Sequence, residues 1–256
     1  METNIVISLD GVTVELGDRT IFDAVSFDVQ KGEFVAILGP NGAGKTTLFK
    51  LLLGLLKPTK GKVRVLGAVP HRGDGNIGYA PQHRVLETDL ALRARDVVGF
   101  GLDGNKWGIG FGSRKRDELI NAVLKEVDAY QFADAAVGHL SGGEQQRLLI
   151  AQALITDPKI LLLDEPLSNL DINHAQEIIT LLTNISKRRE VTIMLVSHDI
   201  NPLLPAANRV LYMAHGHSAM GAPDEVVTSA TLSKLYDTKV ELIRSGGHVF
   251  VVGAEI

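Results

Sequence analysis

The pattern of hydrophobic and polar residues changes several times along the chain, and each pattern predicts a type of element. Apolar and polar residues alternate in residues 5–16 and 24–29, which indicates strands with one buried face. Turn residues separate these two runs, and a third short run follows at 62–66. We therefore expect a small antiparallel sheet in the N-terminal part of the chain.

Three shorter runs are apolar throughout, which is typical of strands buried on both faces. They are residues 34–38, 160–163 and 192–196. A helical pattern at 47–56 follows the first run, and another at about 172–187 separates the other two. Strands that alternate with helices form mostly parallel sheets, so we expect an α/β core with its ligand site at the carboxyl ends of these strands.

A region of different character lies in the middle of the chain. It contains a helical pattern at 91–98, a segment with glycine and aromatic residues at 99–112, and apolar residues at helical spacing from Ile120 to Val127. Asp117 and Glu118 are expected to open this last helix, because acidic residues favour the first turn. The region is predicted to be a helical subdomain.

The chain is therefore predicted to form one domain that contains an inserted subdomain. Residues 83–157 are the predicted helical subdomain, and residues 1–82 and 158–256 are the predicted core with its antiparallel β subdomain. At the C-terminal end we expect two short helices, near 223–227 and 232–236, and then a β-hairpin. The hairpin strands are predicted at 240–243 and 248–252.

Composition and charge restrict the class of protein. The 256 residues are enough for a large core, and the absence of cysteine excludes disulfides and cysteine metal sites. With 26 basic and 30 acidic residues the net charge is −4, which counts against nucleic-acid binding. No signal peptide is recognisable, and no apolar run approaches the roughly 18 residues that span a bilayer. We expect a cytoplasmic protein that meets the membrane through a partner.

Residues 39–47 have the pattern of a phosphate-binding loop. They fit G-x-x-x-x-G-K-[ST] and lie between a strand and a helix. Glycines let the backbone N–H groups and the positive end of the next helix face phosphate oxygens. Lys45 would neutralise the β and γ phosphates and Thr46 would bind magnesium; the alternative is a glycine turn that only joins strand and helix. The loop residues are Gly39, Pro40, Asn41, Gly42, Ala43, Gly44, Lys45, Thr46 and Thr47.

Two adjacent carboxylates follow the apolar run at 160–163. Asp164 is expected to organise a metal ion, as in phosphate-loop nucleotidases. Because successive residues of a strand point in opposite directions, Glu165 is expected to face the γ-phosphate and to polarise an attacking water. The alternative is a pair of solvated carboxylates in a turn.

Ser141 and Glu144 have the spacing of a capping box at the start of a helix. Gly142 and Gly143 follow the serine directly, so the first N–H groups of this helix carry no side chains. This makes the helix start a candidate for a second anion site, although a capping box alone indicates only a well-capped helix.

These motifs, taken in order, resemble those of the ATP-binding subunits of ATP-binding cassette (ABC) transporters. The resemblance covers essentially the whole chain and implies an α/β P-loop NTPase core (RecA-like) with an antiparallel β subdomain and an inserted helical subdomain. The motifs are the phosphate loop at 39–47, Tyr79-Ala80-Pro81-Gln82, the signature at 140–147, the acidic strand at 160–166, Ser168-Asn169-Leu170-Asp171, and Val196-Ser197-His198-Asp199.

The resemblance implies a head-to-tail homodimer that holds two Mg-ATP between phosphate loop and signature of opposite chains. It further implies that Gln82 senses the membrane partner, that Asp171 communicates across the dimer and that His198 contacts the γ-phosphate. The implied catalytic residues are Glu165, His198 and Gln82, the implied magnesium ligands are Thr46, Gln82 and Asp164, and the implied contacts across the dimer are Ser141, Gly142, Gly143, Glu144 and Asp171.

One position departs from the family pattern. Family members commonly stack an aromatic residue on adenine from the loop after the first strand, and this chain has Leu16 there, followed by Gly17. Leu16 is therefore the expected contact to the base, and the lost stacking is worth on the order of 1 kcal/mol at most. Phe22 is the alternative aromatic, with a place in the core as the favoured interpretation.

Further features favour one branch of the family. The short distance from phosphate loop to signature leaves no room for the coiled-coil arm of chromosome and repair ATPases. Residues 96–101 and the tail at 208–236 resemble the zinc and manganese uptake branch, with the iron-siderophore and cobalamin branch as the alternative. The resemblance thus implies a separate membrane permease and, indirectly, an extracytoplasmic substrate-binding protein.

Three alternatives remain open at the sequence level. Trp107 or Phe111 is expected to anchor a permease helix in a groove, or else both aromatics fill the helical core. A soluble ABC ATPase of iron–sulfur cluster assembly would share every catalytic motif. A phosphoryl-transferring kinase would have no use for Ser141.

Overall fold

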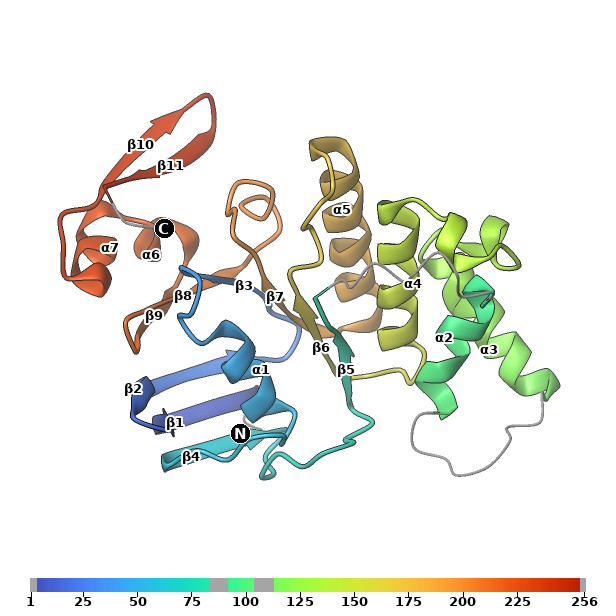
Figure 1. Cartoon of the computed structure of the whole chain (residues 1–256), viewed down its shortest axis with the longest axis horizontal. Helices are drawn as coiled ribbons and strands as arrows, with labels where there is room; N and C mark the ends of the chain where they lie inside the picture. The colour runs from blue at the N-terminus through green and yellow to red at the C-terminus, as the bar shows by residue number, and fades with distance from the viewer. Residues whose placement is uncertain (1–3, 83–91, 104–112, 254–256) are drawn as a thin grey trace.

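In the part of the chain that the structure describes, the strands form a six-stranded sheet, a three-stranded sheet and a two-stranded hairpin (Figure 1). The computed structural model describes residues 4–82, 92–103 and 113–253. The strands are β1 (Ile5–Leu16), β2 (Arg19–Gln30), β3 (Phe34–Leu38), β4 (Lys60–Val65), β5 (Ile77–Ala80), β6 (Ile160–Asp164), β7 (Thr192–Val196), β8 (Arg209–Ala214), β9 (His217–Gly221), β10 (Glu241–Ser245) and β11 (His248–Val252).

Within the described residues, one α-helix follows β3, three lie between β5 and β6, one follows β6 and two follow β9. They are α1 (Lys45–Leu52), α2 (Ala94–Asp103), α3 (Arg114–Glu126), α4 (Gly142–Leu154), α5 (Ile172–Arg189), α6 (Pro223–Val226) and α7 (Ser229–Tyr236), with short 3-10 turns η1 (Tyr130–Phe132) and η2 (Val137–His139).

The three-stranded sheet is antiparallel, in the order β2-β1-β4, as the alternating pattern predicted. Leu9 lies at its centre, opposite Phe27 on β2 and Val63 on β4. All three side chains are buried, because the alternation puts them on the same face of the sheet.

The six-stranded sheet has the order β5-β6-β7-β3-β8-β9, and only β9 runs antiparallel. Ala80 pairs with Leu163 and Asp164 pairs with Val196. This register brings the ends of β5, β6, β7 and β3 to one edge of the sheet. The residues that follow these strands are therefore neighbours, at the edge of the sheet where the ligand site is predicted.

β8 and β9 were not predicted from the sequence. Residues 210–214 form an apolar run of the same kind as the predicted buried strands, and β8 pairs directly with β3. His215 and Gly216 turn the chain into β9 with positive φ angles of 48° and 83°. The missed signal was this short apolar run before a glycine turn.

Alternate residues of β3 pack into two separate cores. Phe34, Ala36 and Leu38 belong to a core that includes residues of α2, α3, α4 and α5. Val35 and Ile37 belong to a second core that includes residues of β1, β2 and α1. Successive side chains of β3 point to opposite faces of the sheet, so this strand contributes to both cores. Burial of each large apolar side chain contributes about 1.5–3 kcal/mol.

Helices α2, α3 and α4 lie together on one flank, away from the three-stranded sheet (Figure 1). Their bounds differ from the predicted ones: α2 is Ala94–Asp103 instead of 91–98, and α3 starts at Arg114 instead of Asp117. The hydroxyl of Ser113 accepts a hydrogen bond from the Arg116 N–H and so caps α3 earlier than its acidic residues suggested.

Two sequence predictions about this region remain predictions. The subdomain bounds 83–157 begin at a residue outside the described part of the chain. Trp107 and Phe111, the candidate permease anchors, also lie outside the described residues.

The C-terminal hairpin of β10 and β11 forms as predicted, with Ile243 opposite Phe250. Helix α1 begins at Lys45, before the expected residue 47, and ends at Leu52, because Gly54 with φ of 65° breaks the pattern. Within residues 4–82, 92–103 and 113–253, none of the helices is long and apolar enough to cross a membrane.

Candidate active site

The loop between β3 and α1 has a backbone that only glycine fits at two positions. Gly39 and Gly44 have φ angles of 142° and 95°. A Cβ on Gly39 would lie 2.0 Å from the carbonyl oxygen of Met213, and one on Gly44 would lie 2.5 Å from the ring of Phe22. The loop is therefore packed tightly between β8 and β2, with the N-terminus of α1 directly behind it.

The ammonium of Lys45 closes this loop from within. It donates hydrogen bonds to the carbonyl oxygens of Gly39 at 2.7 Å and Pro40 at 2.9 Å. Burial lowers the pKa of Lys45, and the nearby carboxylates of Glu165 and Asp164 act in the opposite direction. A buried cation at a helix N-terminus is suited to bind a phosphate group.

Asp164 ends β6 and is only 4% exposed. The Thr46 hydroxyl donates to its Oδ2 at 3.3 Å. Burial raises the pKa of the Asp164 carboxyl, and hydrogen bonds from Thr46 and Tyr79 partly offset this. Burial and Asp164 together raise the pKa of Tyr79 to about 12. Two adjacent oxygen donors of this kind fit the ligand preference of Mg²⁺, so the residues present are compatible with a magnesium ion.

Glu165 lies after the strand, where its backbone has a positive φ of 52°. The expectation that simple strand alternation orients it is therefore wrong, because β6 ends at Asp164 and a turn sets the direction of Glu165. The carboxylate accepts from Gln82 Nε2 at 2.8 Å and lies 2.6 Å from His198 Nε2. Gln82, which follows β5, and His198, which follows β7, thus both contact the carboxylate of Glu165, which follows β6.

A cavity of about 490 Å³ connects the phosphate loop with this carboxylate. Two of its lining residues, Arg19 and Ile21 from β2, were not predicted, since a single sequence gives no sign that β2 contacts the loop. Leu16 is not among the lining residues. The lining residues are Arg19, Ile21, Asn41, Gly42, Gly44, Lys45, Thr46, Thr47, Gln82, Glu165 and His198.

Phe22 is 1% exposed and belongs to the second core, against Gly44. The alternative in which Phe22 contacts the base is thereby excluded, and its place in the core is confirmed. Ala43 is also buried, with 7% exposure, and supports the loop from below. Leu16 is 47% exposed at the end of β1.

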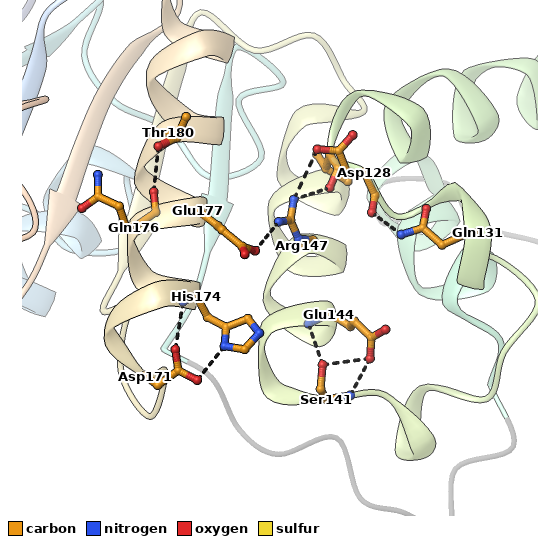
Figure 2. Close-up of polar contacts among 11 residues, drawn as sticks. Asp128, Gln131, Ser141, Glu144, Arg147, Asp171, His174, Gln176, Glu177 and Thr180 are labelled. Atoms are coloured by element: carbon orange, nitrogen blue, oxygen red, sulfur yellow. Dashed lines mark hydrogen bonds and ion pairs between the residues drawn. The ribbon is translucent and has the colours of Figure 1, made fainter.

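The signature residues lie apart from this cavity, at the start of α4 (Figure 2). The Glu144 carboxylate accepts from the N–H and the hydroxyl of Ser141, each at 2.8 Å, and the Ser141 hydroxyl accepts from the Glu144 N–H at 3.3 Å. The predicted capping box is therefore present. Gly142 and Gly143 follow it, so the first N–H groups of α4 are not covered by side chains of their own residues.

Asp171 caps the neighbouring helix α5 (Figure 2). Its Oδ1 accepts from the His174 N–H at 2.9 Å and its Oδ2 lies 2.7 Å from the His174 ring nitrogen Nδ1. Bonds from His174 lower the pKa of Asp171, and the same pair raises the pKa of His174. A Cβ on Gly143 would lie 3.4 Å from the His174 ring, so the signature and Asp171 are adjacent through His174.

Arg147, three residues after Glu144, joins the signature helix to α5 (Figure 2). Its guanidinium donates to the carbonyl oxygen of Val127 and to the carboxylate of Glu177, each at 3.0 Å. Arg147 is part of the signature, but no role was predicted for its side chain. The structure makes it a link between the signature helix and a helix of the α/β core.

The loop, the parallel strands and the carboxylate at their edge define a phosphate-loop nucleotidase. A family model described as ABC transporter matches residues 22–168, and the chain belongs to this family of ATP-binding, ATP-hydrolysing subunits.

Relatives with assigned roles are similar over most of the chain. The zinc import ATP-binding protein ZnuC of Marinobacter nauticus is 35% identical over 224 residues, 88% of this chain and 80% of that protein. A probable metal transport system ATP-binding protein of Thermotoga maritima is 33% identical over 232 residues, 90% of each.

Two solved structures support the same fold. An inward-facing structure of a putative metal-chelate type ABC transporter matches with a TM-score of 0.81 at 26% identity, covering 97% of this chain and 96% of that one. A dimeric post-hydrolysis structure of the ATP-binding cassette MJ0796, bound to ADP and phosphate, matches with a TM-score of 0.71 at 28% identity, covering 84% and 98%. The predicted α/β P-loop NTPase fold is confirmed.

Proposed function

We propose that this chain is the ATPase subunit of a metal importer, which dimerises on two Mg-ATP and energises a separate membrane permease. The observation that carries the proposal is the Glu165 carboxylate, held between Gln82 and His198 at the end of the phosphate-loop cavity. The cargo would be a divalent metal ion, zinc or manganese.

The proposed hydrolysis follows from the positions of these side chains. The N–H groups of residues 42–47 and the Lys45 ammonium bind the phosphates, and Thr46 and Asp164, with Gln82 nearby, would hold the magnesium ion. When bound, magnesium neutralises charge on the β and γ phosphates. Glu165 orients a water against the γ-phosphate and accepts its proton, while His198 contacts the γ-phosphate and steadies the Glu165 carboxylate.

The proposed homodimer completes this site. Ser141 and Asp171 are not among the residues that line the cavity, so one chain supplies only part of the contacts expected around the nucleotide. A second copy in head-to-tail orientation would bring Ser141, Gly142, Gly143 and Glu144 onto the γ-phosphate, with Asp171 beside them. The dimeric state of the cassette bound to ADP and phosphate supports this arrangement.

The metal cargo is inferred from relatives, because the ATPase subunit does not contact the cargo. The relative from Marinobacter nauticus is named for zinc import and that from Thermotoga maritima for metal transport. A permease would hold the chain at the inner face of the cell membrane, and an extracytoplasmic substrate-binding protein would deliver the metal. The alternative cargo is an iron-siderophore or cobalamin, which the metal-chelate transporter supports.

Glu165→Gln tests the catalytic proposal. The variant should lose ATP turnover while it keeps ATP binding, and it should run as a dimer in gel filtration at saturating Mg-ATP. A monomer under these conditions would contradict the proposal, because the uncleaved nucleotide should hold the two copies together.

Copurification from detergent-solubilised membranes tests the transport proposal. The chain should bring down a permease with several membrane spans, whereas recovery of soluble proteins alone would favour the cluster-assembly alternative. Accumulation of zinc, manganese and iron in cells without the gene then identifies the cargo.

A further inference from the structure

Arg19 and Leu16 face each other across the turn between β1 and β2, but only one of them reaches the nucleotide cavity. The two residues are paired in the strand register. Leu16, at the position where relatives of this family commonly stack an aromatic residue on the base, is 47% exposed and does not line the cavity. Arg19 does line it. The residue expected to contact the base, Leu16, is therefore aliphatic, and its partner in the strand register, Arg19, carries a guanidinium.

The guanidinium of Arg19 extends over the phosphate loop. A Cβ on Gly42 would lie 3.5 Å from Arg19 Nη2, which places this nitrogen beside the loop backbone. Ile21, two residues on, directs its side chain to the other end of the loop, where a Cβ on Gly44 would lie 2.8 Å from it. The start of β2 thus packs against the loop, and Arg19, although exposed to solvent, lines the cavity.

Arg19 is also the cation of this cavity that has no acceptor of its own. The ammonium of Lys45 is bonded to the carbonyl oxygens of Gly39 and Pro40. The guanidinium of Arg19 has no hydrogen bond or ion pair to another side chain or to the backbone within the described ranges of the chain. A guanidinium presents a planar fork of donors that matches two phosphate oxygens, and it is more weakly hydrated than an ammonium. The chemistry of Arg19 therefore suits a phosphate group.

We propose that Arg19 binds the phosphate groups of the nucleotide and supplies the affinity that a stacked aromatic residue would otherwise supply at the base. This inference rests on the proposed function in one respect, namely that residues 39–47 hold a nucleotide. Most of the affinity for the nucleotide then comes from contacts to its phosphate groups, and Leu16 contributes only an aliphatic contact to the base. As a consequence, the protein binds ATP and GTP with similar affinity.

The experiment measures the Kd of the full chain for ATP, GTP and inorganic tripolyphosphate with magnesium, by displacement of a fluorescent ATP analogue. Tripolyphosphate lacks both base and ribose, so it isolates the phosphate contact. The unaltered chain should bind ATP and GTP within about threefold of each other. Arg19→Ala should raise the Kd of all three ligands about tenfold, which is about 1.4 kcal/mol.

Three further variants sharpen the result. Arg19→Lys should recover part of the affinity, because an ammonium keeps the charge but not the fork. Arg64→Ala, on an exposed arginine of β4 that does not line the cavity, should change none of the three values. Leu16→Tyr in the Arg19→Ala background should lower the Kd of ATP and leave that of tripolyphosphate unchanged.

Two outcomes would overturn the inference. Arg19→Ala could leave tripolyphosphate binding unchanged, which would assign the guanidinium to the base or ribose or to no ligand at all. Alternatively, the unaltered chain could bind ATP a hundredfold more tightly than GTP. If the unaltered chain displaced no analogue with any ligand, the nucleotide site itself would fail, and Lys45→Ala would then have no effect either. Thermal unfolding and circular dichroism of each variant confirm that it is folded.

Discussion

The Nε2 atom of His198 lies 2.6 Å from the Oε1 atom of Glu165, although 33 residues separate them in the chain. The contact exists because β6 and β7 are parallel neighbours, so that both residues leave the same edge of the sheet. Gln82 holds the other carboxylate oxygen at 2.8 Å. The orientation of Glu165 is thus fixed from both sides.

We expect His198→Ala to lower kcat by about 10²-fold or more, because one side of the Glu165 carboxylate loses its support and, under the proposed function, the γ-phosphate loses a contact. The Kd for ATP should change much less, since the residues of the phosphate loop are untouched. Steady-state ATPase assays and nucleotide binding separate the two quantities. An equal loss in kcat and in affinity would show that His198 acts mainly in binding.

Gly44→Ala should destabilise the protein and abolish nucleotide binding. The added Cβ would lie 2.5 Å from the Phe22 ring, at a backbone φ of 95°. Gly67→Ala is the matched control, because Gly67 has a φ of 79° but nothing within 4 Å of an added Cβ. Gly67→Ala should lower the unfolding free energy only by the backbone strain, about 1–2 kcal/mol. Its melting temperature in thermal unfolding should therefore be well above that of Gly44→Ala. Equal melting temperatures would contradict the packing argument.

Asp164→Asn should change how stability depends on pH in the nucleotide-free protein. Burial raises the pKa of Asp164 in the folded state above that of the unfolded chain. Folding therefore favours the protonated form, and this contribution to the unfolding free energy is largest at low pH and decreases as pH rises through the raised pKa. Asp164→Asn removes the buried charge. The melting temperature of the variant should therefore rise relative to that of the unaltered protein as pH increases from 4 to 8. Parallel curves would contradict this.

The same substitution should weaken the dependence on magnesium. An asparagine keeps the size of Asp164 but loses the anionic oxygen near Thr46, so a higher magnesium concentration should be needed for half-maximal ATPase activity. Titration with magnesium at a fixed ATP concentration measures this shift. Asp224→Asn is a suitable control, since Asp224 is exposed on α6 and does not line the phosphate-loop cavity.

Asn201→Ala should release the C-terminal hairpin from the loop that carries His198. The Asn201 side chain donates to the Val249 carbonyl oxygen at 3.0 Å and accepts from the Val249 N–H at 2.7 Å. Loss of this pair should cost about 1–3 kcal/mol of unfolding free energy, because it leaves partly buried backbone groups without partners. Hydrogen exchange should become faster in residues 248–252. Unchanged exchange there would show that buried Val249 and its neighbours hold the hairpin without Asn201.

Local patterns were sufficient for many of the elements. The alternation in residues 5–16 and 24–29 predicted two strands of one sheet, and the apolar runs predicted β3, β6 and β7, because buried faces impose a period on neighbouring residues. The capping box at Ser141 was likewise predicted, since all its atoms come from four consecutive residues. Each of these features depends on contacts within a short stretch of chain.

The sequence by itself determined the phosphate loop, the acidic strand end and the motif order that identifies the family, because these motifs are defined by residue type and spacing along the chain. Only the tertiary structure placed β8 beside β3, oriented Glu165 through a positive φ, brought Arg19 to the cavity and left Leu16 outside it. These results depend on strand register and on packing between segments far apart in the chain. Residue spacing alone does not encode such contacts, since many registers are compatible with the same local pattern.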